Sequence, residues 1–146
     1  GWGNYGTDYS LRAAAAFSAL GAVLPQDDTY YVASGDGKHT YTITFPAGQT
    51  PPTNAFWGID MYDDQLHLVD NPINRYAIGP HLAPVNYNAD GSLTIYIQNA
   101  QPSTSAEQQN WLPAPEGIFL LVMHVYWPQE PLLNGTWSPP PLTKTN

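Results

Sequence analysis

Apolar and polar residues alternate with a period of two through most of the chain after residue 28, and this pattern constrains the fold more than any other feature. In the segment 117–127, alternation places two sets of side chains on opposite faces of a strand. One set is Phe119, Leu121, Met123 and Val125, and the other is Leu120, Val122, His124 and Tyr126. Seven strand-like segments occur: TYYVAS, HTYTITFP, AFWGIDMYD, LHLV, RYAIG, LTIYIQ and IFLLVMHVYW. The pattern predicts a mainly β protein.

Turn-forming residues separate these segments. They lie in GDGK (35–38), FPAGQTPPT (45–53), DNPIN (70–74), NADGS (88–92) and WLPAPEG (111–117). Because these connections carry no helical pattern, the strands favour antiparallel pairing over a parallel α/β sheet. A chain of 146 residues is long enough for one core. We therefore predict a single domain, 1–146, folded as an antiparallel jelly-roll-like β-sandwich.

One helix is expected, in the N-terminal segment 1–24. Thr7 or Asp8 is placed to cap the alanine-rich run YSLRAAAAFSALG, and Gly21 is placed to end it. One face carries residues spaced for packing against a sheet, namely Leu11, Ala14, Ala15, Ser18 and Ala19. At the other end, three consecutive prolines predict an extended tail over 137–146.

Charge and composition exclude several classes of function. Four Lys and Arg against twelve Asp and Glu give a net charge of −8, which repels nucleic acid and anionic membrane surfaces. The chain has no cysteine, so disulfides, thiolate nucleophiles and Cys-ligated metals are excluded. The apolar stretches 13–24 and 117–127 are shorter than the ~20 residues of a membrane span.

Several features are typical of an extracytoplasmic or secreted protein. The chain has 15 Pro, 12 Gly, 10 Tyr and 5 Trp, and few lysines. Asn134 begins an Asn-Gly-Thr triplet, which makes it a candidate glycosylation site. The first residue, Gly1, is expected to result from processing or trimming of a longer chain.

Arg12 and Arg75 are the only arginines. Guanidinium groups pair well with carboxylates, so we expect both to form structural ion pairs with nearby aspartates. The candidate partners are Asp8, Asp60, Asp63, Asp64 and Asp70. The alternative is that Arg75, with Tyr76, binds an anionic or carboxylate-bearing ligand.

The other polar residues give weaker signals. Six aspartates would supply ligands for calcium if two loops converged, although they also suit ordinary turns: Asp27, Asp28, Asp36, Asp60, Asp63 and Asp64. If Asp60 and Asp63 share a strand, they point to opposite faces. The histidines lack metal-ligand spacing, and His124 fits a core or cleft position: His39, His67, His81 and His124. We predict no cofactor or metal.

Nineteen aromatic residues are more than a core of this size needs. Exposed tyrosines and tryptophans stack on sugar rings or fill subunit interfaces, although they also pack against neighbouring prolines. Trp111 lies between Asn110 and a Pro-Ala-Pro step, in a loop position where binding residues are common.

Six phrases in order together resemble one family, and they cover nearly the whole chain. They are GTDYSLRAAAA, YTITFPAGQTPPTNAFWGIDMYD, NPINRYAIG, NADGSLTIYIQ, NWLPAPEGIFLLVMHVYWP and GTW. They resemble domain of unknown function 1214, which often follows domain of unknown function 1254. The resemblance implies a jelly-roll-type β-sandwich and no established reaction. The phrase GDGKHTYTITF departs from related sequences, which tend to have a longer loop there.

Three functions remain. The first is a non-catalytic module that assembles with its own copies as a homo-oligomer, or that recognises carbohydrate or another ligand. The alternative is an enzyme acting on a small polar or sugar-like substrate, with a cleft lined by Arg75, Tyr76, Asp60, His67 and Trp111. The family resemblance alone implies the third, a structural partner for the companion domain.

Overall fold

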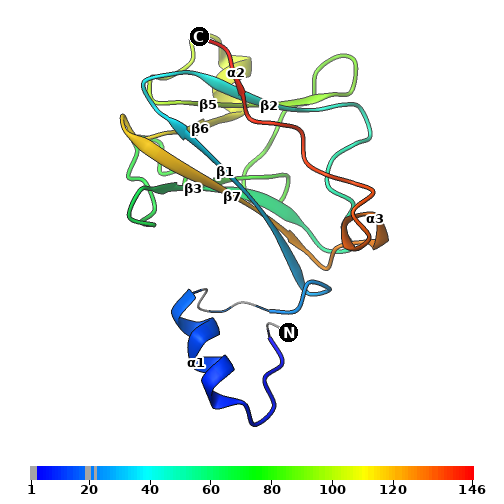
Figure 1. Ribbon diagram of the computed structural model, residues 1–146. Helices are drawn as coiled ribbons and strands as arrows, with labels where there is room; N and C mark the ends of the chain where they lie inside the picture. The colour runs from blue at the N-terminus through cyan, green and yellow to red at the C-terminus, as the bar shows by residue number, and fades with distance from the viewer. Residues whose placement is uncertain (1–2, 19–20, 22) are drawn as a thin grey trace.

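The computed structural model describes residues 3–18, 21 and 23–146, which form two four-stranded sheets (Figure 1). Sheet A is fully antiparallel and has the order β1 (Asp28–Asp36), β7 (Ile118–Tyr126), β3 (Trp57–Asp63), β4 (Ala77–Ile78). Sheet B has the order β6 (Trp111–Pro113), β5 (Leu93–Gln98), β2 (Tyr41–Phe45), β8 (Thr143–Lys144). The mainly β prediction is confirmed. Both sheets are open, and the jelly-roll topology stays a prediction.

Sheet B contains one parallel pair, β5 with β6, where the sequence predicted antiparallel strands throughout. The chain crosses between them through α2 (Ser105–Gln109), a helix that the sequence analysis did not identify. Thr104 and Glu107 form a capping box at its start, since each side chain bonds to the backbone of the other. This short crossover returns the chain to the same end of the sheet, as parallel pairing requires.

The two sheets share one hydrophobic core, and the predicted alternation positions it. In β7 the four residues of the first set are buried, and the residues between them are more exposed. Leu93, Ile95 and Ile97 of β5 pack from sheet B in the same way. Burying one side of each strand stabilises the pair of sheets by removing apolar area from water.

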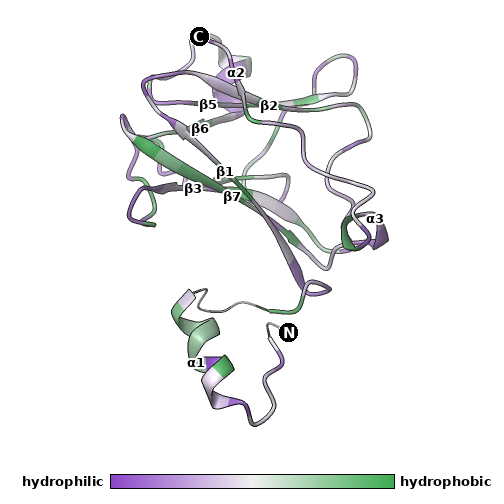
Figure 2. Ribbon diagram, viewed as in Figure 1, coloured by the Kyte–Doolittle hydropathy of each residue, from purple (hydrophilic) through white to green (hydrophobic). Residues whose placement is uncertain are grey.

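The helix α1 (Tyr9–Ser18) forms where the sequence predicted, because the carboxylate of Asp8 accepts a hydrogen bond from the Leu11 amide at 2.9 Å. Its predicted packing is wrong. Of the described helix residues only Ala15 is buried, and Figure 1 shows α1 apart from both sheets. The helix face that was predicted to pack against a sheet consists largely of small side chains, which bury little area on contact. Ala19, the last residue of that face, lies outside the described residues. Figure 2 shows apolar residues on this helix as well as along β7.

After α3 (Glu130–Leu133), the C-terminal residues run along the edge of the molecule. The Trp137 ring contacts the Tyr31 ring edge-to-face, with centroids 5.9 Å apart. Residues 138–142 have no regular secondary structure, and β8 then pairs with β2. Within the described residues, no helix has both the length and the apolar composition needed to cross a bilayer.

Candidate functional site

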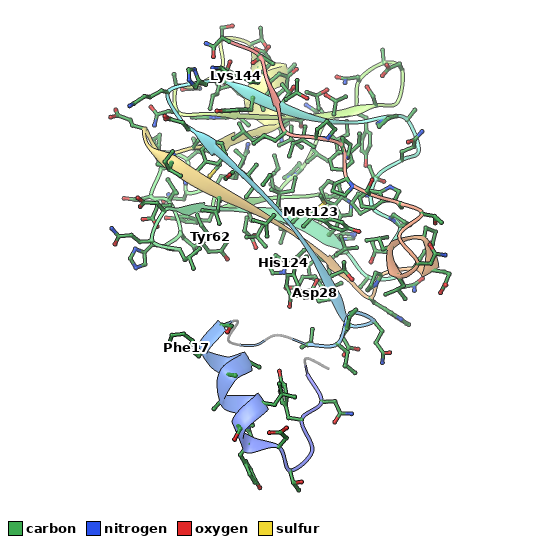
Figure 3. All side chains as sticks on the ribbon, viewed as in Figure 1. Phe17, Asp28, Tyr62, Met123, His124 and Lys144 are labelled. Carbon is green, nitrogen blue, oxygen red and sulfur yellow. The ribbon has the colours of Figure 1, made fainter. Side chains whose placement is uncertain are left out.

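The outer face of sheet A carries a group of interacting ionisable side chains, in which one histidine contacts two aspartates. The register aligns Tyr30 of β1 and Gly58 of β3 with His124 of the central strand β7, and the side chains of Tyr30 and His124 point away from the core. Asp28 and Asp60 project from the same face, one on each side of β7. Figure 3 shows Asp28 and His124 close together on the side of sheet A that faces α1. We call Asp28, Asp60 and His124 the Asp-His-Asp cluster.

His124 interacts with both carboxylates. Its Nδ1 lies 3.0 Å from Oδ2 of Asp28, and its Nε2 lies 3.4 Å from Oδ2 of Asp60. Asp28 is almost fully buried, at 3% exposure, whereas the side chains of His124 and Asp60 keep 20% and 26%. The cluster is therefore open to solvent at its Asp60 end and closed at its Asp28 end.

The cluster is strongly coupled electrostatically. The hydrogen bond with Asp28 raises the pKa of His124 above its ordinary value, against the effect of burial, and the charges of both aspartates add to the rise. Burial raises the pKa of Asp60, while the imidazolium opposes the rise. Two carboxyl groups against one imidazole make the cluster rich in acceptor oxygens, which suits a hydroxyl donor or a cation.

One oxygen of the cluster has no partner. Oδ1 of Asp28 is buried and accepts no hydrogen bond from any described residue. Buried polar atoms are normally paired, so an unpaired carboxylate oxygen costs free energy that the His124 contact must offset.

Aromatic rings surround the cluster. Tyr30 meets His124 edge-on at 4.8 Å, and Tyr126 lies parallel to it at 5.8 Å. Phe56 stacks on the far side of Tyr126 at 4.6 Å. Tyr62 lies further along β3, and burial followed by the charge of Asp60 raises its pKa. These rings give the outer face flat apolar surfaces beside a polar centre.

At Gly58 there is no room for a side chain between β3 and the loop that carries Leu82. A Cβ there would lie 2.4 Å from Cδ1 of Leu82, so the loop that carries Leu82 packs directly on the strand. Leu82 thereby forms a wall beside His124, and a larger residue at position 58 would displace it.

The five residues predicted to line one cleft do not come together. Asp60 belongs to the cluster, whereas Arg75 and Tyr76 line a separate open pocket of about 450 Å³. His67 lies in the turn after β3, where its amide bonds to Oδ1 of Asp63 and lowers the pKa of that carboxyl. Trp111 is 2% exposed and its indole donates to the Gln98 carbonyl, so the predicted exposed platform is wrong.

The ion pair predicted for Arg75 is also wrong. Its Nη1 donates to the carbonyls of Gln108, Gln109 and Trp111, at 3.1, 3.1 and 2.7 Å. Two of these carbonyls end α2, where unpaired acceptors favour a cation. Among the described residues, neither this arginine nor the exposed Arg12 lies within 4.0 Å of a carboxylate.

The predicted aspartate sites are spread over the fold. Asp60 and Asp63 both lie on β3, and their odd spacing directs them to opposite faces as expected. In the part of the chain that the structure describes, no group of three or more His, Asp or Glu side chains is arranged to hold a metal ion. The side chain of Asn134 accepts hydrogen bonds from Thr136 in an exposed turn after α3, and its glycosylation stays a prediction.

Alternation put His124 on the strand face opposite Met123, but the sequence predicted a core or cleft position for it and gave no sign of its partners. Asp28 lies 96 residues away from it in the chain, in a position that resembled a turn aspartate. The available signal was that Asp28 begins a strand on the same face as Tyr30, which alternation alone reveals.

Comparison with known proteins places the chain in a family without an assigned function. A family model described as a protein of unknown function (DUF1214) matches residues 26–130, and the chain belongs to this family. No curated protein matches the chain.

Two solved structures share the fold. The VPA0106 protein from Vibrio parahaemolyticus is 23% identical, with a TM-score of 0.75 over 93% of this chain and 35% of its own. A putative uncharacterized protein from Burkholderia cenocepacia is 17% identical, with a TM-score of 0.58 over 91% of this chain and 31% of its own. The chain thus spans about a third of the length of these relatives.

Proposed function

We propose that this chain is a non-catalytic, extracytoplasmic recognition module that binds carbohydrate on the outer face of sheet A. One observation carries the proposal: a half-exposed carboxylate and imidazolium, Asp60 and His124, lie within a frame of tyrosine rings on a single sheet face. Sugars offer both hydroxyl groups and flat C–H surfaces, and this face has complementary groups for both.

The two parts of the site have separate roles. Asp60 accepts hydrogen bonds from ligand hydroxyls, since its carboxylate reaches solvent while His124 holds it in place. Tyr30 is 40% exposed and meets His124 only edge-on, which leaves ring area for a sugar to stack on, and the partly exposed ring of Tyr126 borders that surface. The flatness of the face favours an extended oligosaccharide over a small molecule enclosed on all sides.

Isothermal titration calorimetry with cello-, xylo-, manno- and chito-oligosaccharides tests this proposal. Tyr126→Ala removes the ring that packs on His124 and borders the site, and it should weaken binding roughly tenfold, equivalent to ~1.4 kcal/mol. Tyr87→Ala is the matched control, because Tyr87 is 52% exposed and lies outside the site. Asp60→Asn should weaken binding as well. Absence of heat with every sugar, or equal losses in both tyrosine variants, would reject the carbohydrate site.

Self-assembly is a second candidate, favoured by the state of α1. A ten-residue helix is marginal in water on its own, yet α1 leaves Phe17 94% and Leu11 44% exposed. Packing of this apolar surface against another copy would supply the stabilisation that the helix lacks. In light scattering over a concentration series, Phe17→Glu should dissociate the oligomer, and Leu133→Glu on α3 should not. A wild-type monomer at every concentration rules this candidate out.

A further inference from the structure

The backbone of β1 forms a free edge of sheet A, and its hydrogen-bond register shows which groups are free. The Trp127 amide donates to the Asp27 carbonyl at 2.8 Å, and the Gly37 amide donates to the Gly117 carbonyl at 2.9 Å. These two bonds lie just beyond the ends of the β1–β7 ladder, at the odd-numbered residues 27 and 37. Because bonded pairs alternate in an antiparallel ladder, the odd residues between them bond to β7 and the even residues face outward.

The outward-facing groups are used at both ends of the strand and free in the middle. The Asp28 amide donates to the Leu24 carbonyl at 3.2 Å, and the Asp36 amide donates to the Tyr41 hydroxyl at 3.1 Å. Between them, the amides and carbonyls of Tyr30, Val32 and Ser34 have no backbone partner among the described residues. Three residues of exposed edge therefore remain available for pairing.

An apolar pocket of about 190 Å³ lies beside this free edge. Val32 and Ala33 of β1 line it together with Pro139–Pro141 of the C-terminal tail. The pocket extends inward to the core residues Ile43, Ile59 and Met123. Proline has no backbone N–H, so the three tail prolines border the edge strand without offering amide donors to it.

We propose that the free edge of β1 binds an extended peptide as an added strand, with one bulky apolar side chain inserted into the pocket between β1 and the proline tail. Backbone bonds to Tyr30, Val32 and Ser34 hold the peptide. The pocket selects the peptide residue opposite Ala33, because residues paired across two strands point to the same face and Ala33 faces the core. The ends of the edge carry Asp27 and Asp36, and the chain has a net charge of −8. Peptides with basic residues at both ends are therefore favoured.

Charge also disfavours a second copy as the occupant. Antiparallel pairing of two β1 strands centred on Val32 would place Asp28 of one copy opposite Asp36 of the other, at both ends. Like charges directly opposite one another destabilise a strand pair. A basic-flanked peptide has no such conflict.

Fluorescence polarisation with the labelled heptapeptide Lys-Val-Thr-Leu-Thr-Val-Lys tests the proposal on the whole chain. Main-chain bonds supply most of the affinity in this mode of recognition, so a designed sequence suffices as the probe. We expect saturable binding that is lost when the peptide amides facing β1 are N-methylated. Replacing both lysines with glutamate should weaken binding roughly tenfold, because Asp27 and Asp36 at the ends of the edge then repel the glutamates at the ends of the peptide.

Two variants of one edge residue provide the matched comparison. Val32→Pro removes one donor from the edge, where proline is tolerated, and should weaken binding roughly tenfold. Val32→Thr keeps the amide and should bind within about twofold of the wild type, because the main-chain bonds that carry this mode of recognition are unchanged. Thermal melts check that both variants fold. No saturable binding at millimolar peptide, equal binding of the N-methylated peptide, or self-association through β1 in place of peptide binding would overturn the proposal.

Discussion

Asp28→Asn tests the coupling within the Asp-His-Asp cluster. The substitution keeps the size of the side chain and removes the charge that His124 contacts at 3.0 Å. A hydrogen bond to a charged partner contributes ~1.5–3 kcal/mol, and the near-complete burial of Asp28 limits replacement by water. We expect a loss of about 2 kcal/mol in the free energy of unfolding at mildly acidic pH, or roughly 4–8 °C in Tm for a chain of this size.

The sign of the pH dependence follows from the raised pKa of His124. The unfolded chain has a histidine pKa of ~6.5, and the folded value is higher. The stabilising contribution is therefore complete below ~6.5 and is lost as the pH rises through the folded pKa. The Tm difference between wild type and Asp28→Asn should thus be largest at about pH 5.5 and should shrink towards pH 9 as His124 loses its proton, since neutral His124 gains little from a charged partner.

Differential scanning fluorimetry across that pH range measures the effect. Asp64→Asn is the matched control, because Asp64 is an exposed turn residue and the change should shift Tm by no more than ~2 °C at either pH. An equal Tm loss for Asp28→Asn at both pH values would show that His124 protonation does not carry the interaction. No loss near pH 5.5 would refute the coupling altogether.

Three further substitutions test contacts that stabilise the fold, and each is measured by thermal or denaturant unfolding. Gly37→Ala should prevent folding or sharply lower Tm, because its Cβ would lie 1.6 Å from the Pro115 carbonyl oxygen, whereas Gly117→Ala meets nothing within 4 Å and should be tolerated. Arg75→Met removes the donor to three carbonyls and should cost about 2 kcal/mol. Trp111→Phe removes the indole hydrogen bond to the Gln98 carbonyl, which still accepts from the Ala114 amide, and should cost about 0.5–1.5 kcal/mol.

Alternation predicted the strands and their faces because it reflects a local property of the chain, the burial of one side of each strand. It correctly separated the two faces of β7, but it did not show that the face of His124 points away from the core, since a core or cleft position was predicted for that residue. It could not predict that β6 pairs in parallel with β5, because pairing direction depends on the path of the connection. The capping box of α2 was present in the sequence, but the helix is only five residues long and has no apolar period.

The candidate site was less predictable, because Arg75 and Trp111, two of the residues predicted to bind a ligand, stabilise the fold instead. With only four Lys and Arg in the chain, the sequence predicts that Arg75 pairs with a carboxylate or binds a ligand. The crossover at α2 instead leaves helix-end carbonyls that need a donor, and Arg75 supplies it. Trp111 follows the same helix and is drawn into the core by the parallel pairing of β6. Neither requirement is visible until the crossover is known.

The two proposed binding surfaces meet at β1, and this makes them separable by experiment. The side chain of Tyr30 contacts His124 on the outer face, while its backbone belongs to the free edge. A change of side chain on β7, such as Tyr126→Ala, alters the face and leaves the edge backbone intact. Val32→Pro does the reverse, since it removes an edge amide without touching the cluster. If sugar binding responds only to the first variant and peptide binding only to the second, two sites share one strand. If both ligands respond to both variants, Tyr30 couples the sites, and each ligand must change the affinity of the other by the same factor.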